Sequence, residues 1–255
     1  MKRFIGILQF MTRIPIKADI GFDEEFHKSI VYFPLVGFVI GLISYLIGCL
    51  AIKVFDPFVT SILIVGAEVI ITGGLHIDGL GDTFDAIYSN RDKERMLEIM
   101  KDSRLGTNSL LAILFLVLIK IGVLTNIINA NLLWIIIFMP LVSRLGVIVM
   151  LYKTVTPRKV GMGNIFIGKA TLSMFIIAVI YSIAIIGLIS KFIFLSSDLL
   201  LIKLLSSILI VMLFDYLFKN HIYKKIDGIT GDILGCTIEL GELIFILYVY
   251  IIMVI

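Results

Sequence analysis

The sequence predicts an all-α polytopic membrane protein with about seven transmembrane helices. Hydrophobic residues make up 60% of the 255 residues and charged residues only 16%, with a mean hydropathy of +1.10, whereas soluble domains carry about 25% charged residues. The apolar residues gather in stretches of about 20, the length that crosses a bilayer. Basic residues follow alternate stretches. Together these observations predict a chain embedded in a lipid bilayer.

Seven apolar stretches are the predicted spans. They cover residues 30–54, 58–76, 108–128, 132–152, 171–194, 199–218 and 234–255. Because no linker or shift in composition separates the halves, we expect one membrane domain over residues 1–255. Gly37 and Gly41 in the first span have the G-x-x-x-G spacing that indicates close helix packing. The oligomeric state stays open, and a homo-oligomer is compatible with the sequence.

Basic residues are distributed over alternate loops. Five Lys or Arg precede the first span, and the loops that follow carry one, five, none, four, one and three, with Lys203 a further residue near the fifth of these loops if it reaches outward. By the positive-inside rule, the N-terminus is cytoplasmic and the C-terminus lies outside. The net charge of +3 forms no single basic face, which argues against a nucleic-acid partner. We expect a multi-pass protein of the cell membrane with its active site facing the cytoplasm.

An acidic segment at the end of the second span is the strongest functional signal. It runs from Gly73 to Asp85 as Gly-Gly-Leu-His-Ile-Asp-Gly-Leu-Gly-Asp-Thr-Phe-Asp. If the helix continues, Asp78, Asp82 and Asp85 lie on one stripe. Like charges so placed repel, and hard oxygen ligands favour Mg²⁺ or Mn²⁺. His76 is a neighbouring candidate base. The alternative is a solvated acidic turn, which would not require a shared face.

The segment before the third span is a candidate phosphate site. Arg104 and the free backbone N–H groups at the start of a helix suit a phosphate. Asp102 is close enough in sequence to join the metal site. The alternative is an ordinary helix cap whose basic residues follow the positive-inside rule.

Charged residues inside apolar spans form a second candidate group. Arg144 lies in the fourth span, and Asp232, Glu239 and Glu242 lie at the start of the last. A charge at such a position costs at least about 2.5 kcal/mol and usually faces the interior of the bundle. These side chains are expected either to line a substrate pocket or to form intramembrane ion pairs. A structural bridge from Arg144 to one of the acids is as good an interpretation as a catalytic role.

Five segments, in order, resemble the cobalamin synthase family, the adenosylcobinamide-GDP ribazoletransferases. The segments are Phe10 to Pro15 (Phe-Met-Thr-Arg-Ile-Pro), Tyr32 to Gly37 (Tyr-Phe-Pro-Leu-Val-Gly), Gly73 to Asp85, Met100 to Thr107 (Met-Lys-Asp-Ser-Arg-Leu-Gly-Thr), and Thr230 to Gly235 leading to Glu239 to Glu242. The resemblance covers nearly the whole chain. It departs at Gly81, where the family commonly has Ala, and at Ala86, where Gly is common. Neither difference removes a carboxylate.

The resemblance implies a Mg²⁺-dependent transferase that joins adenosylcobinamide-GDP to α-ribazole, or to its 5′-phosphate, and releases GMP. Such phosphoryl transfer depends chiefly on positioning and electrostatics. Under this reading the metal ligands are Asp78, Asp82, Asp85 and Asp232, the catalytic residues are His76, Asp85 and Asp102, and the substrate-binding residues are Arg104, Arg144, Lys169, Glu239 and Glu242.

Two other functions stay open. The acidic run is similar to the metal motif of membrane CDP-alcohol phosphotransferases, but Leu80, Gly81 and Asp82 follow Asp78 and Gly79 where that motif has Ala-Arg. An ion-coupled carrier would also place Arg and Glu inside the membrane. Such a carrier would more readily show matched motifs in its two halves, and we find none.

Overall fold

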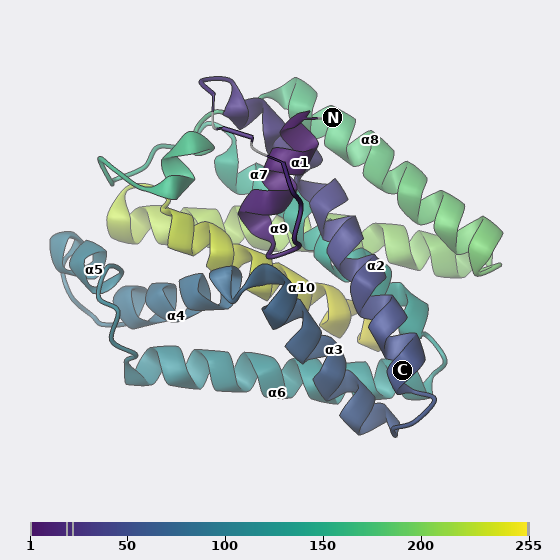
Figure 1. Cartoon of the computed structure of the whole chain (residues 1–255). Helices are drawn as coiled ribbons and strands as arrows, with labels where there is room; N and C mark the ends of the chain where they lie inside the picture. The colour runs from purple at the N-terminus through teal and green to yellow at the C-terminus, as the bar shows by residue number, and fades with distance from the viewer. Residues whose placement is uncertain (1, 19, 22, 254–255) are drawn as a thin grey trace.

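The protein is a bundle of α-helices, shown by the computed structural model in Figure 1. The structure describes residues 2–18, 20–21 and 23–253. No β-strand forms within these residues, where Tyr152 and Ala170 make an isolated bridge. The all-α class predicted from composition is therefore confirmed.

Ten α-helices are found in the described part of the chain. They are α1 (Lys2–Met11), α2 (Phe33–Ala51), α3 (Pro57–Thr72), α4 (Leu75–Ile87), α5 (Lys93–Ile99), α6 (Thr107–Asn129), α7 (Met139–Leu151), α8 (Leu172–Leu188), α9 (Asp198–Ile226) and α10 (Gly231–Met253). Short 3-10 helices occur at Phe26–Tyr32, Leu133–Phe138 and Met162–Ile165, and a π-helical turn at Ile189–Ile193 follows α8.

Six helical segments of the described chain are long and apolar enough to cross a membrane, and the bent pair of α3 and α4 raises the number to seven. Each predicted span overlaps one of these segments. The predicted end of the last span, residues 254–255, lies outside the described residues. In the apolar stretch of Leu133–Leu151, which contains α7, 89% of the residues are buried, whereas in that of Leu172–Ile193, which contains α8, 17% are buried. Helix α7 is thus central and α8 peripheral.

The second predicted span does not run straight into the acidic segment. Helix α3 begins where Asp56 accepts a hydrogen bond from the Val59 backbone N–H (2.9 Å) and Pro57 occupies the first turn. It ends at Gly73 and Gly74, which both adopt left-handed backbone angles (φ +64° and +74°). Two such residues in succession stop the helix, and α4 leaves at 91° to α3. The expectation of one continuous helix over residues 58–76 is therefore wrong.

Two close helix contacts fix the centre of the bundle. A Cβ atom on Gly37 would lie 2.1 Å from the Pro140 backbone oxygen, and one on Gly41 would lie 2.2 Å from that of Ile137. Helix α2 therefore packs backbone against backbone with the start of α7 and with the 3-10 helix Leu133–Phe138 before it, which confirms the prediction from the G-x-x-x-G spacing.

Helix α10 connects this centre to the acidic segment. It packs along α4, α7 and α9, and Figure 1 shows α4 beside α6 and α10. A Cβ atom on Gly79 of α4 would lie 2.6 Å from the Asp232 backbone oxygen of α10. This close approach brings the aspartates of α4 next to the start of α10.

Candidate active site

Asp78 and Asp82 are the aspartates that α4 leaves without a partner. Both lie in one helix, four residues apart and so on one face, as the spacing predicts. In the described part of the chain neither side chain has a hydrogen-bond donor or an ion-pair partner. The charges of Asp78, Asp232 and Asp85 disfavour the ionised form of the Asp82 carboxylate, and the charge of Arg158 favours it, so these groups are neighbours. Asp78 is exposed, so its carboxylate is open to a cation or a ligand.

Asp85 has a different environment. Its carboxylate accepts hydrogen bonds from the backbone N–H groups of Gly106 (2.7 Å) and Ser109 (2.9 Å). These groups lie at the start of α6, where backbone donors have no partner within the helix. A Cβ atom on Gly106 would lie 2.3 Å from the Asp85 carboxylate, so residue 106 needs to be glycine. Asp85 therefore joins α4 to α6, and its predicted roles in metal binding and catalysis stay predictions.

Asp232 pairs with Arg158, a residue to which the sequence assigned no role. The Arg158 Nη1 atom lies 2.7 Å from the Asp232 carboxylate, while Nε and Nη2 are buried without a partner among the described residues. The loop between α7 and α8, which contains Arg158, reaches α10 because Gly163 and Gly231 are in close contact. A Cβ on Gly163 would lie only 2.8 Å from the Gly231 Cα. The sequence signal was weak, since Arg158 is one of several basic residues in that loop.

Asp102 and Arg104 form an exposed pair in the loop before α6. Arg104 Nε lies 3.0 Å from both Asp102 carboxylate oxygens, and the Arg104 backbone N–H also donates to Asp102. These hydrogen bonds lower the pKa of Asp102 to about 2. Asp102 is therefore ionised at neutral pH and already bound to a cation, so it is a weak base.

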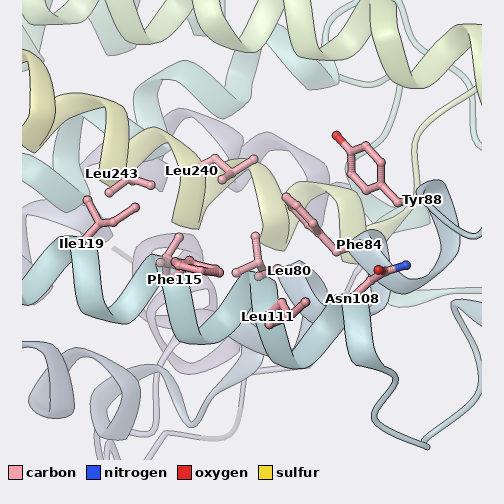
Figure 2. Close-up of a pocket in the computed structure, with 11 residues that line it drawn as sticks. Leu80, Phe84, Tyr88, Asn108, Leu111, Phe115, Ile119, Leu240 and Leu243 are labelled. Carbon is pink, nitrogen blue, oxygen red and sulfur yellow. The ribbon is translucent and has the colours of Figure 1, made fainter.

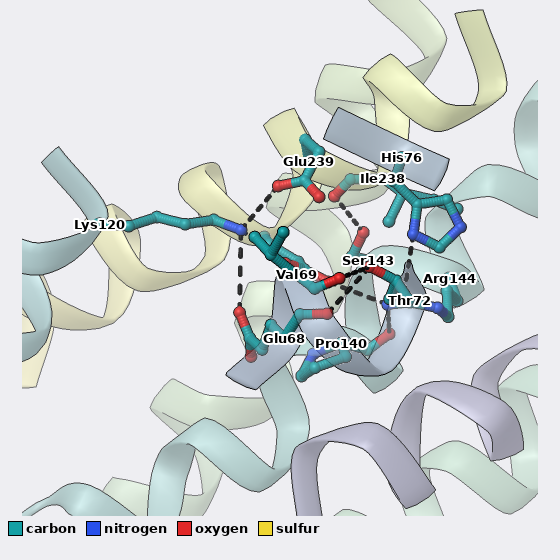
Figure 3. Close-up of polar contacts among 11 residues, drawn as sticks. Glu68, Val69, Thr72, His76, Lys120, Pro140, Ser143, Arg144, Ile238 and Glu239 are labelled. Carbon is teal, nitrogen blue, oxygen red and sulfur yellow. Dashed lines mark hydrogen bonds and ion pairs between the residues drawn. The ribbon is translucent and has the colours of Figure 1, made fainter. Parts of the chain in front are cut away.

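The charged residues of the spans form a buried cluster (Figure 3). Lys120 Nζ lies 2.9 Å from Glu239, 2.6 Å from Glu242 and 3.9 Å from Glu68, and Arg144 Nη1 lies 2.9 Å from Glu242. All five side chains are at most 11% exposed. The interpretation of Arg144 as a partner of an intramembrane acid is confirmed. The substrate-binding roles of Arg144, Glu239 and Glu242 stay predictions.

His76 links the buried cluster to the acidic segment. Its Nδ1 atom lies 3.3 Å from Arg144 Nη2, and its Nε2 atom is buried without a partner in the described structure. His76 and Asp78 lie within one turn of α4 and line the same cavity. The histidine thus has one nitrogen committed to the cluster and one available to a ligand.

Two cavities meet at Asp78. The central cavity, of about 390 Å³, is lined by His76, Asp78, Arg158 and Asp232 together with apolar residues that include Phe10, Phe33 and Phe166. The loop cavity, of about 300 Å³, is lined by Asp78, Asp82, Lys101, Asp102, Ser103 and Arg104. Lys169 lines neither cavity, so the structure does not bring this predicted phosphate ligand to the acids.

A third hollow is an apolar groove between α4, α6 and α10 (Figure 2). Leu80, Phe84, Phe115 and Leu240 lie along it, and it has a volume of about 360 Å³. It contains no carboxylate, Lys or Arg, so it has no group for phosphate chemistry.

The acidic segment fits a magnesium ion that is shared with a substrate. No group of three or more His, Cys, Asp or Glu side chains in the described residues forms a complete metal site. Mg²⁺ is, however, commonly held by one or two carboxylates together with substrate phosphates and water. The unpartnered Asp78 and Asp82 meet that requirement, and Lys101 and Arg104 add positive charge to the wall of the same cavity.

Comparison with known proteins gives one consistent result. The family described as cobalamin-5-phosphate synthase matches residues 3–250. Proteins named adenosylcobinamide-GDP ribazoletransferase are similar over almost their whole length. One from Clostridioides difficile (strain 630) is 68% identical, covering 98% of this chain and 97% of the relative. One from Alkaliphilus metalliredigens (strain QYMF) is 42% identical, covering 99% and 96%. One from Clostridium novyi (strain NT) is 41% identical, covering 97% and 96%. No solved structure gives a significant match.

Proposed function

Because the chain belongs to the cobalamin-5-phosphate synthase family and is a transferase of cobalamin biosynthesis, we propose the following reaction for it. The adenosylcobinamide phosphate moiety of adenosylcobinamide-GDP passes to α-ribazole or its 5′-phosphate, GMP is released, and Mg²⁺ is required. The name of these relatives supports the donor and the class of acceptor. The unpartnered pair of Asp78 and Asp82, beside Lys101 and Arg104, is the observation that supports metal-assisted transfer from a diphosphate.

Transfer breaks one bond and forms one. A ribose hydroxyl oxygen of the acceptor attacks the phosphorus next to cobinamide, and the bond from that phosphorus to the GMP oxygen breaks. Asp78 and Asp82 would hold Mg²⁺, which neutralises charge on the diphosphate and on the leaving GMP. Lys101 and Arg104 bind further phosphate oxygens, because cations placed at developing negative charge lower the barrier. Asp102 holds the Arg104 side chain in place for this contact.

His76 acts as a hydrogen-bond donor in this proposal, in place of its predicted role as a base. A guanidinium group can only donate, so the contact with Arg144 makes Nδ1 the accepting nitrogen and leaves the proton on Nε2. That N–H can donate to a ligand in the central cavity. The hydroxyl proton then goes to a carboxylate, and Asp232 is the carboxylate on the wall of that cavity that is not assigned to the metal.

The proposed orientation is N-terminus in the cytoplasm, C-terminus outside, and active site facing the cytoplasm, in one domain of the cytoplasmic membrane. Contacts between the basic segments support it. Lys93 pairs with Asp227 at 2.8 Å, and Arg158 pairs with Asp232. The loops that carry most of the basic residues therefore lie at one end of the bundle, as the positive-inside rule requires for a cytoplasmic face.

The decisive experiment is a transfer assay with detergent-purified protein. Adenosylcobinamide-GDP is incubated with α-ribazole or its 5′-phosphate, with Mg²⁺ or with EDTA, and the cobalamin product and GMP are measured by chromatography and mass spectrometry. Equal amounts of both products, only with Mg²⁺, are expected. Folded protein without product for either acceptor would overturn the proposal. CDP-alcohol substrates and then ligand uptake into sealed vesicles would be tested next.

A further inference from the structure

The two cavities that meet at Asp78 differ in chemistry. The loop cavity is lined by Lys101, Arg104 and Ser103 together with three carboxylates, of which Asp102 is paired with Arg104. One end of the central cavity is aromatic, because Phe166 makes edge contacts with Phe10 (5.4 Å between ring centroids) and Phe33 (5.3 Å). The two spaces therefore suit different ligands.

The two substrates of the proposed reaction differ in the same way. The donor carries a diphosphate, which needs cations and metal-binding carboxylates. The acceptor is a nucleoside with a benzimidazole base, a flat apolar bicycle that packs well against the edges and faces of aromatic rings. A volume of about 390 Å³ falls within the range of small-molecule sites, about 300–1,000 Å³.

The polar end of the central cavity is where the ribose would lie. Arg158 has two buried nitrogens without a partner, and His76 has a buried Nε2 without a partner, in the structure described here. Buried donors normally find an acceptor. Ribose hydroxyl oxygens would supply acceptors at this end, and the Asp232 carboxylate could accept from a hydroxyl proton.

We propose that the acceptor nucleoside binds in the central cavity, with its base against Phe10 and its ribose between Arg158 and Asp78, while the donor diphosphate binds in the loop cavity. This assignment rests on the proposed function. The transferred phosphorus then passes from one cavity to the other at Asp78, the residue common to both. The reverse arrangement puts a guanine at the aromatic end, where phenylalanines cannot pair with its polar edge.

Steady-state kinetics with separate variants test the assignment. Phe10 is half-buried and lines the cavity. Phe10→Leu keeps an apolar side chain, and it is expected to raise KM for the acceptor about 10-fold while leaving KM for the donor within about 2-fold, because loss of an aromatic–base contact has this order of effect. Lys101→Gln is expected to do the opposite. Phe192→Leu is the matched control, since Phe192 is 76% exposed and lines none of the three hollows. It should change neither KM.

A second variant and a binding measurement complete the test. Met162 lines the central cavity but is 65% exposed, so Met162→Ala should raise the acceptor KM without loss of folding if Phe10→Leu unfolds. Calorimetric titration with α-ribazole in EDTA measures acceptor binding without turnover, and weaker binding to the Phe10 variant is expected. A donor KM that rises with Phe10→Leu while the acceptor KM stays constant would overturn the assignment. Wild-type protein that binds α-ribazole but forms no product would count against the proposed function. The cavity assignment would then be tested by comparing the titrations of the wild type and the variant.

Discussion

The protein contains two groups of acidic residues that differ in how their charge is balanced. In the membrane interior, Glu239 and Glu242 lie within 2.9 Å of Lys120, and Glu242 also pairs with Arg144. On α4, Asp78 and Asp82 have no ion-pair partner within the described residues, and Arg158, which pairs with Asp232, acts on Asp82 without pairing with it. Burial of a charge is costly unless the charge is paired. The acids of this cluster therefore have partners within the protein, whereas the acids of α4 border two cavities in which a ligand can supply the balance.

The difference separates structural acids from candidate catalytic ones better than residue type or depth does. By sequence alone, Glu239 and Glu242 could equally line a substrate pocket or form intramembrane ion pairs. The contacts of Lys120, which comes from a different helix, distinguish them. Substitutions in α4 should therefore lower turnover, whereas substitutions in the buried cluster should lower stability.

The largest expected effect is on turnover, from Asp78→Asn. The substitution keeps the shape of the side chain but removes the charge at the point where the two cavities meet. Loss of a metal ligand removes several kcal/mol of electrostatic stabilisation, so turnover should fall by about 10³-fold. Thermal unfolding in detergent should stay near that of the wild type. Turnover near the wild-type level in folded protein would remove Asp78 from the mechanism.

The next effect is on stability, from Arg144→Met. Removing one member of a buried pair leaves an uncompensated charge and typically costs about 3–5 kcal/mol. We expect a clearly lower unfolding temperature in detergent, and Arg144→Lys, which keeps a positive charge, should recover part of the loss. An unfolding temperature unchanged in Arg144→Met would show that the cluster is not primarily structural, and the contrast with α4 would fail.

The smallest expected effect comes from Gly79→Ala, which tests how α4 is held. The added Cβ would lie 2.6 Å from the Asp232 backbone oxygen, so α4 has to shift away from α10, at a cost of about 1–3 kcal/mol. The matched control is Gly122→Ala in α6, where nothing lies within 4 Å. Thermal unfolding in detergent is measured for both variants. Equal stability of the two variants would show that the close contact does not position the aspartates.

Much of the fold could be predicted because it depends on local patterns. Span positions follow from apolar length, and the shared face of Asp78 and Asp82 follows from helix periodicity. The 91° bend was missed, although two adjacent glycines were visible at residues 73 and 74. The pairing of Arg158 with Asp232 joins positions far apart in the chain. Such a contact depends on how helices and loops pack, which no local spacing reports.

The short α3 has a consequence for the surrounding lipid. Its 16 residues span about 24 Å at 1.5 Å per residue, whereas the hydrocarbon layer of a typical bilayer is about 30 Å thick. The bend at Gly73 and Gly74 thus turns the chain before α3 could cross such a layer unaided. Hydrophobic mismatch of this size is relieved by local thinning or by water entering beside the helix. The bilayer around α3 would then be drawn in toward the aspartates, which brings the headgroup region to the substrates.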